Sequence, residues 1–262
     1  MKICRFIDPE TQRPRFGMIE AEAVFTLLGD LSEGSLSIEG AESSIKLADA
    51  KLLPPVAPSK IVCVGRNYRE HAAELGNPMP EEPLLFLKPP SALIGDGDTI
   101  LLPTASERIE HEGELAVVIG RRCSRIADDE DPLAFILGYT CVNDVTARDL
   151  QRKDVQFTRA KSFDTFCPVG PFVVTGLDPL DMHVETRVNG QVRQSGRTSS
   201  LAFPVPYLLR YISHVMTLEP GDLIATGTPA GVGPLRDGDI VEVEVEGVGT
   251  LRNPVGKLGT HT

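Results

Sequence analysis

The sequence predicts a strand-rich mixed α/β fold with few short helices and a small N-terminal β domain. Its 262 residues include 24 glycines and 21 prolines, which divide the chain into many short apolar runs. The stretch DGDIVEVEVEG (237–247) alternates strictly, so its valines would face a core and its glutamates would face solvent. The stretch HVETRVNGQVRQSG (183–196) alternates around Asn189-Gly190, which is a strong hairpin signal.

The N-terminal part contains two short strand patterns, KICRFI (2–7) and FGMIEAEAVFTLL (16–28). The segment PPVAPSK (54–60) follows them and has three prolines, which is typical of a linker. We therefore expect a small β domain with its linker over residues 1–57 and a larger domain over 58–262.

The larger domain is predicted to alternate strands with a few helices. Asn67 as N-cap and Gly76 as a stop signal predict a short helix over 68–75. Further helices are expected at 145–154 and at 205–218, where the apolar residues have helical spacing. Strands are expected in IVCVG (61–65), LLFLKPP (84–90), ELAVVIG (114–120) and CPVGPFVV (167–174), and helix followed by strand in AFILGYTCVND (134–144).

Composition excludes several classes of function. The net charge of -11 and the pI of about 5.0 disfavour a nucleic-acid partner or an anionic membrane surface. The start MKICRFIDPE has no apolar secretory segment, and no apolar run approaches the roughly 18 residues that span a bilayer. Five cysteines without a CxxC pair indicate reduced thiols. We expect a cytoplasmic protein.

The stretch HEGELAVVIG (111–120) places Glu112 and Glu114 two residues apart, so in a strand both would lie on one face. Two buried like charges are costly unless a cation joins them, although a solvated strand end is the simpler alternative. Asp144 would add a third carboxylate, but an acid before a helix is also a common cap. Such an all-oxygen site would favour Mg²⁺, Mn²⁺ or Ca²⁺ over zinc.

Cationic and polar candidates follow. Arg148 and Gln151 lie four and seven residues after Asp144, so on a helix the three would share a face. Arg148 would neutralise a carboxylate of the substrate or of the protein, or would form a surface ion pair. Lys161 stands between aromatic residues in FTRAKSFDTF, and would either face a substrate oxyanion or lie on the surface.

His71 and Glu74 are three residues apart on the expected short helix and can touch. A carboxylate that orients a histidine makes a general base for water, although surface pairs of this kind are common. The loop TGTPAGVG (226–233) offers backbone N–H groups and Thr228 to an anion, or is only a glycine turn. It lacks the Lys-Ser/Thr and the helix of a nucleotide-binding loop.

Residues from about 60 to 255 resemble the fumarylacetoacetate hydrolase family. The matching pieces occur in order: GRNYREHAAELG, LFLKP, HEGELAVVIG, NDVTARDLQ, AKSFDTFCPVG, VNGQVRQSG, TSSL and GDLIATGTPAGVG. The resemblance implies a mixed β-sandwich roll, usually dimeric. Because its N-terminal part is short, the chain is similar to the acylpyruvase, oxaloacetate decarboxylase and dienedioate isomerase branch of the family.

The resemblance also implies roles for individual residues. Glu112, Glu114 and Asp144 would bind Mg²⁺ or Mn²⁺, with Ca²⁺ as a substitute. The remaining matched positions are the catalytic pair His71 and Glu74, the family lysine at Lys161, the Arg148 and Gln151 positions, and a substrate-carboxylate loop at Gly227 and Thr228. Arg66, Arg69 and Lys88 are candidates for a second substrate carboxylate.

The function implied is a metal-dependent hydrolase that cleaves a carbon–carbon bond in an acylpyruvate, a small 2-oxo acid, to give pyruvate and a carboxylic acid. His71 would activate the water, and the metal with Lys161 would stabilise the pyruvate enolate. The same enolate serves an oxaloacetate decarboxylase or tautomerase and a 2-hydroxyhepta-2,4-diene-1,7-dioate isomerase, which remain alternatives. A non-catalytic metal-binding protein is a more distant one. A homodimer is expected.

Overall fold

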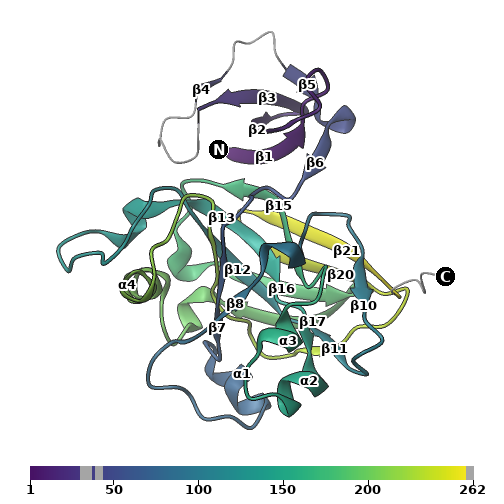
Figure 1. The fold of residues 1–262 in the computed structure, drawn as a ribbon, viewed down its shortest axis with the longest axis vertical. Helices are drawn as coiled ribbons and strands as arrows, with labels where there is room; N and C mark the ends of the chain where they lie inside the picture. Colours follow the sequence, from purple (N-terminus) through teal and green to yellow (C-terminus); the bar gives the residue numbers. More distant parts are fainter. Residues whose placement is uncertain (30–36, 39–43, 258–262) are drawn as a thin grey trace.

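The strand-rich fold is confirmed by a computed structural model, which describes residues 1–29, 37–38 and 44–257 (Figure 1). Residues 258–262 of the expected larger domain lie outside these ranges. The described chain forms three sheets of 13, 5 and 3 strands together with four short α-helices. None of the helices in this described part has the length and apolar character to cross a bilayer.

The largest sheet has the strand order β4-β3-β2-β1-β15-β13-β12-β18-β7-β8, and β5, β6 and β9 pair beside β3, β1 and β15. Its strands are β1 (Lys2–Ile7), β2 (Pro14–Glu20), β3 (Ala23–Leu28), β4 (Ser37–Ile38), β5 (Ser44–Lys46), β6 (Lys51–Leu53), β7 (Ile61–Gly65), β8 (Leu84–Lys88), β9 (Leu93–Ile94), β12 (Gly113–Ile119), β13 (Ile136–Asn143), β15 (Cys167–Val174) and β18 (Leu223–Ala225).

The second sheet has the order β10-β21-β20-β16-β17 and the third the order β14-β11-β19. Their strands are β10 (Ile100–Leu102), β21 (Gly249–Lys257), β20 (Ile240–Val245), β16 (His183–Val188), β17 (Gln191–Arg197), β14 (Thr146–Ala147), β11 (Ile109–His111) and β19 (Gly233–Pro234). The helices are α1 (Arg69–Glu74), α2 (Arg148–Lys153), α3 (Thr158–Lys161) and α4 (Val205–Val215). Single 3-10 turns cover Leu47–Asp49, Pro90–Ala92, Pro132–Phe135, Pro179–Asp181 and Thr198–Ser200.

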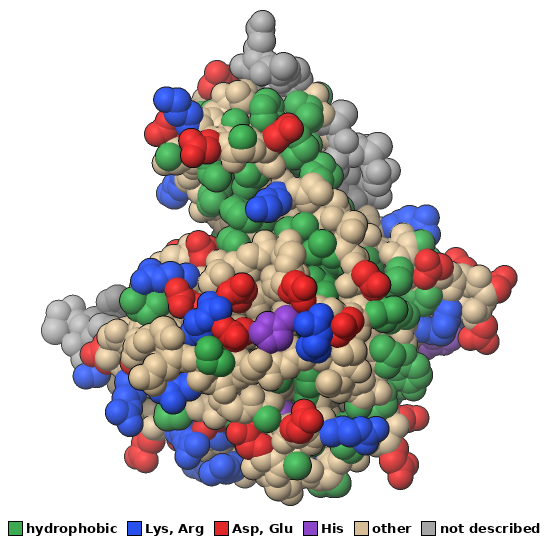
Figure 2. Space-filling model, turned by 180° about the vertical axis from the view of Figure 1, so that it is seen from behind, with side chains coloured by type: hydrophobic (Ala, Val, Ile, Leu, Met, Phe, Trp, Pro, Cys, Tyr) green, Lys and Arg blue, Asp and Glu red, His purple; other side chains and the backbone are tan. Residues whose placement is uncertain are grey.

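Strands β1–β6 form a small unit above the larger body in Figure 1. They nevertheless continue the main sheet, because β1 pairs with β15 through Lys2↔Val174 and Ile3↔Val173. The expected domain boundary at residue 57 stays a prediction. The face shown in Figure 2 carries acidic and basic side chains interspersed over the larger body.

The two strand patterns that carried the fold prediction are confirmed. Strands β16 and β17 form the expected hairpin, and Asn189 and Gly190 have φ of 53° and 75°, the positive values of a type I′ turn. In β20 the valines at 241, 243 and 245 are buried, whereas Glu242 and Glu244 are partly exposed.

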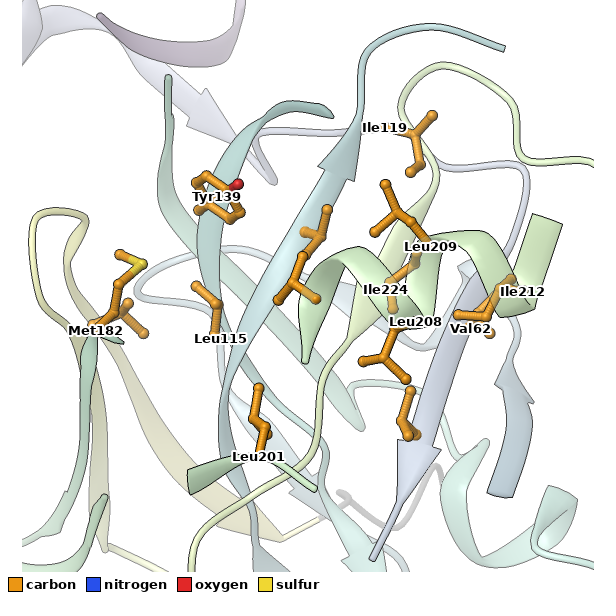
Figure 3. Packing of buried hydrophobic residues seen from close by; sticks show 14 of the residues in the cluster. Val62, Leu115, Ile119, Tyr139, Met182, Leu201, Leu208, Leu209, Ile212 and Ile224 are labelled. Atoms are coloured by element: carbon orange, nitrogen blue, oxygen red, sulfur yellow. The ribbon is translucent and has the colours of Figure 1, made fainter. Parts of the chain in front are cut away.

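Helix α4 packs against the main sheet and supplies four buried residues of the largest core cluster (Figure 3). Val205, Leu208, Leu209 and Ile212 are buried at the i, i+3, i+4 and i+7 spacing of an amphipathic helix. The helix is shorter than expected from the sequence. It ends at Val215 because the following residues are extended and β-bridge Leu218 to Cys123.

Helix α1 also departs from the sequence expectation, since Asn67 is not its cap. Tyr68 occupies the cap position without a side-chain hydrogen bond. The Asn67 amide is instead buried and donates to the carbonyls of Phe203 and Thr226, at 3.0 and 2.7 Å. Its side chain thereby joins the start of α1 to the loop after β18.

Candidate active site

The candidate site lies where several strands of the main sheet begin or end. Strand β12 begins at Gly113 opposite Asn143, the last residue of β13. Strands β7 and β18 are parallel, so the segments that follow them, Arg66 and Gly227 among others, emerge at the same edge. This arrangement brings the segments around Arg66, Gly113, Asn143 and Gly227 together at one edge of the sheet.

Three carboxylates meet at this edge. Glu112, Glu114 and Asp144 are all buried, and one ligand oxygen from each lies within 4.8 Å of the others. Backbone contacts explain the approach: the Glu112 N–H donates to Asn143 Oδ1 at 2.9 Å, and the Asp144 N–H donates to the Glu112 carbonyl at 2.8 Å. Glu112 stands between β11 and β12 rather than inside one continuous strand.

Buried cations surround these carboxylates. Lys161 Nζ donates to Glu112 Oε2 and to Asp144 Oδ2, both at 2.6 Å. Lys88 Nζ donates to the other oxygen of Asp144, at 2.6 Å, and to the Val145 carbonyl at 3.1 Å. Both lysine side chains are at most 2% exposed, so Lys161 is not the surface lysine that the sequence left open.

Arg148 connects the site to helix α2. Its guanidinium pairs with Glu112 through Nη2, donates to Gln151 Oε1 at 2.5 Å, and donates through Nε to Glu110 Oε2 at 2.7 Å. The expected helical face shared with Asp144 is wrong, because α2 begins only at Arg148 and Asp144 precedes it. Arg148 and Asp144 come together through the fold around them instead.

Glu110 is a site residue that the sequence analysis missed. It is 1% exposed and lies between the guanidinium groups of Arg148 and Arg108, whose Nε atoms are 2.7 and 2.6 Å from its oxygens. The signal available was the alternation of Glu110 with Glu112 and Glu114 in IEHEGE. The buried cluster therefore contains four carboxylates against the three cations Lys88, Lys161 and Arg148.

The pKa values of Glu112 and Glu114 are shifted in opposite directions. Burial raises the pKa of Glu112, but Lys161 and Arg148 outweigh it, so that pKa lies below its ordinary value. Burial and the charges of Asp144 and Glu112 raise the pKa of Glu114 well above its ordinary value. Among the described residues no lysine or arginine pairs with Glu114, which accepts a hydrogen bond from the Gly227 N–H at 2.7 Å.

These residues fit a divalent cation. Glu114 is a buried carboxylate without a cationic partner in the described chain, and Lys161 is itself held by two of the three carboxylates. An oxygen-only donor set of this kind suits Mg²⁺, Mn²⁺ or Ca²⁺. Glu112, Glu114 and Asp144 are the residues that would hold the cation.

His71 and Glu74 project from helix α1. His71 Nδ1 lies 3.5 Å from Glu74 Oε2, too long for a strong hydrogen bond. Burial lowers the pKa of His71 despite the opposing charge of Glu112. The Glu74 carboxylate accepts the Gly231 N–H at 3.1 Å, so the glycine loop holds it in place. Burial therefore favours the neutral form of the His71 imidazole, which lines the cavity described below.

The loop after β18 is more occupied than the sequence suggested. The Gly227 N–H is taken by Glu114, so Gly227 supports a candidate metal ligand rather than a substrate. The Thr228 hydroxyl donates to the Gly113 carbonyl at 2.8 Å and also faces the cavity. Gly227 has φ of +106°, and a Cβ there would lie 2.7 Å from the Asn67 Cβ, so only glycine fits.

These groups surround a cavity of about 250 Å³. Its lining includes the predicted residues Arg66, His71, Glu112, Glu114, Asp144, Arg148, Gln151, Lys161 and Thr228, together with Phe86, Phe157 and the unforeseen Arg152. Arg66 has φ of +57°, a strained conformation for a non-glycine residue. Lys88 and Arg69 are not among the residues that line this cavity: Lys88 donates to Asp144, and Arg69 is exposed at the start of α1.

A strand-rich fold that gathers a buried carboxylate cluster, a buried histidine and several cations around one cavity is typical of an enzyme. The chain belongs to the fumarylacetoacetate hydrolase family: the model described as Fumarylacetoacetate (FAA) hydrolase C-terminal matches residues 60–256. A second model, Rv2993c-like, N-terminal, matches residues 1–55.

Similar proteins carry isomerase and tautomerase names. Oxaloacetate tautomerase YisK of Bacillus subtilis is 46% identical over 225 residues, 80% of this chain and 74% of that protein. The structure of 5-carboxymethyl-2-hydroxymuconate delta-isomerase from Mycobacterium smegmatis has a TM-score of 0.88 and 47% identity, covering 98% of this chain and 100% of that one. The 2-hydroxyhepta-2,4-diene-1,7-dioate isomerase from Mycobacterium marinum has a TM-score of 0.88 and 44% identity, covering 99% and 100%.

Proposed function

We propose that this protein is a divalent-cation-dependent tautomerase or isomerase of small 2-oxo dicarboxylic acids, with oxaloacetate as the simplest candidate substrate. The observation that carries the proposal is a buried histidine, His71, which lines the same cavity as the carboxylate cluster. The names of the relatives support this reading over the acylpyruvate hydrolase expected from the sequence.

Tautomerisation moves a proton between the carbon next to a carbonyl and the carbonyl oxygen, so one base and a set of positive charges are sufficient. In the direction from keto to enol, the unprotonated nitrogen of His71 would accept the proton from the carbon and deliver it to the enolate oxygen, and the reverse reaction would move the proton back to the carbon. Its lowered pKa keeps it unprotonated at neutral pH. Lys161 and Arg148 would favour the negative charge that develops on oxygen, because both are buried cations that line the cavity.

A doubly charged substrate fits the remaining lining. Arg66 and Arg152 add two further cations to the cavity, and Phe86 and Phe157 provide apolar walls. We assign the two arginines to the substrate carboxylates. Mg²⁺ or Mn²⁺, with Ca²⁺ as a substitute, held by Glu112, Glu114 and Asp144 would supply Lewis-acid stabilisation of the same oxygen charge.

Hydrolysis of an acylpyruvate is the second candidate, and the His71–Glu74 pair favours it. A carboxylate beside the imidazole would stabilise the imidazolium that forms when His71 takes a proton from water. Decarboxylation of oxaloacetate needs no activated water and shares the enolate. The homodimer and the cytoplasmic location expected from the sequence stay predictions.

The test follows the ultraviolet absorbance of enol-oxaloacetate with purified protein and Mn²⁺, with and without a chelator, while pyruvate is assayed separately. Chelator-sensitive loss of the enol without pyruvate is the expected result. Pyruvate from oxaloacetate would identify a decarboxylase instead, and pyruvate with acetate from acetylpyruvate would identify the hydrolase. His71→Gln is the control, since it lacks the base but keeps all three carboxylates.

A further inference from the structure

Gln194 is a buried residue that no step of the proposed reaction uses. It lies on strand β17, where its neighbours Arg193 and Ser195 are exposed, yet its own side chain is fully buried. It is absent from the described lining of the cavity, so it does not contact a substrate there. A buried amide must have its donors and its acceptor satisfied, which makes its partners informative.

All of its partners belong to the two segments that build the site. Oε1 accepts from the Gly113 N–H at 3.0 Å and lies 2.9 Å from His111 Nδ1. Nε2 donates to Thr228 Oγ1 at 2.6 Å and to the Pro229 carbonyl at 2.7 Å. Because a proline carbonyl can only accept, the amide has one possible orientation. His111 Nδ1 must therefore carry the proton that it shares with Oε1.

The first pair of partners encloses a candidate metal ligand. His111 and Gly113 are the chain neighbours of Glu112 on either side, and Gly113 also precedes Glu114. Gly113 approaches the second sheet so closely that a Cβ would lie 2.0 Å from Thr186 Oγ1, and Thr186 pairs with Gln194 across β16 and β17. The backbone between the two glutamates thus rests on Gln194.

The second pair of partners, Thr228 and Pro229, lies in the loop after β18. The Thr228 hydroxyl accepts a hydrogen bond from Gln194 and donates one to the Gly113 carbonyl at 2.8 Å. Gln194, Gly113 and Thr228 therefore form a closed ring of three hydrogen bonds, each between atoms that are buried. A change at any member displaces the glutamate segment and the loop relative to each other.

We propose that Gln194 is a positioning residue that sets the distance between the Glu112–Glu114 ligand segment and the Thr228 loop. This inference rests on the proposed function, because the ligand and substrate roles belong to it. The two polar atoms of the Gln194 amide have separate roles. Oε1 fixes the metal ligands, and Nε2 fixes the residue that faces the substrate.

The experiment compares Gln194→Met with Gln194→Glu. Methionine keeps the approximate shape and loses every hydrogen bond. Glutamate keeps an acceptor for Gly113 and His111 but places an oxygen against the Pro229 carbonyl. Binding of Mn²⁺ alone to the metal-free protein is measured by calorimetry, and KM and kcat are measured with oxaloacetate. Gln191→Met on the same strand, at an exposed position, is the matched control.

We expect Gln194→Met to weaken Mn²⁺ binding about tenfold, the range seen when a group that orients a metal ligand is lost. Gln194→Glu should bind Mn²⁺ at least as well as wild type but raise KM more than it lowers kcat. Wild-type Mn²⁺ affinity and KM in both Gln194 variants would overturn the inference. So would equal losses in both variants that track the unfolding temperature alone. If wild type binds no Mn²⁺, the proposed function falls first and this inference with it.

Discussion

Substituting glutamine for Glu114 should leave the metal-free protein as stable as wild type or more stable, whereas the same substitution at Glu112 should destabilise it. The two residues are two positions apart and equally buried. They differ in partners: Glu112 pairs with Lys161 and Arg148, and Glu114 has the Gly227 N–H. Glutamine at position 114 can still accept that hydrogen bond and no longer repels Asp144.

The sign of each expected change in stability follows from the direction of the pKa shift. The raised pKa of Glu114 means that the folded state holds this proton more tightly than the unfolded chain. Its stabilising contribution is complete below the unfolded pKa and is lost as pH rises through the folded value. At pH 7 burial and the neighbouring negative charges therefore count against the folded state, a cost that Glu114→Gln removes up to the part that neighbouring groups absorb.

Glu112 has the opposite sign. The pKa of Glu112 is lower in the folded protein than in the unfolded chain. Its ionised form therefore stabilises the fold at pH values above the unfolded pKa, and this stabilisation is lost as the pH falls through the folded pKa. Removing one partner of a buried pair costs about 3–5 kcal/mol. Since Lys161 keeps Asp144 and Arg148 keeps Glu110, we expect the lower end of that range for Glu112→Gln.

Urea unfolding at pH 7 in chelator measures both variants, and a second series with Mn²⁺ at 100 times its Kd completes the test. Wild type should gain about 2.7 kcal/mol from the bound cation, and both variants should lose most of that gain. The reasoning would be refuted if Glu114→Gln cost as much as Glu112→Gln without metal. It would also fail if Mn²⁺ stabilised Glu114→Gln as strongly as wild type.

The remaining predictions concern the base and the core. His71→Gln should lower kcat by at least about 100-fold while Mn²⁺ binding by calorimetry stays unchanged; Glu74→Gln should cost less, because Glu74 lies 3.5 Å from the imidazole and is one-third exposed. The acid limb of the kcat/KM profile should fall below pH 6.5, since burial lowers the pKa of His71 and the base stays neutral until the pH drops under that value; a limb above pH 7 would contradict this assignment. Leu208→Ala should lower the free energy of unfolding by about 2–5 kcal/mol in urea titrations, because Leu208 is fully buried on the inner face of α4, and a loss under about 1 kcal/mol would contradict this expectation.

Much of this site was accessible from local sequence patterns. Glu112 and Glu114 stand out in the sequence because alternate residues of an extended segment share a face, although Glu112 lies between two strands, and Asp144 stands out because it ends an apolar run. The hairpin at Asn189-Gly190 followed from its turn residues alone. Such signals depend only on near neighbours in the chain, so they survive without knowledge of the fold.

The supporting residues could not be found in this way. Gln194 contacts His111 across 83 positions of sequence, and Lys88 contacts Asp144 across 56. Lys88 was visible as a lysine in an apolar strand, but its partner decides whether it binds substrate or protein, and the partner is set by sheet order. Asn67 failed as a cap prediction for the same reason, since the carbonyls it serves lie more than 130 positions away.

The pairing of β1 with β15 has a consequence for any shortened form of this protein. Val173 and Val174 present their backbone to Ile3 and Lys2, so removing residues 1–57 would uncover a stretch of apolar strand in the middle of the molecule. An open strand edge recruits other strands, and copies of a truncated chain would do so with one another. In the full chain the N-terminal strands cover this edge of β15 through the β1 pairing.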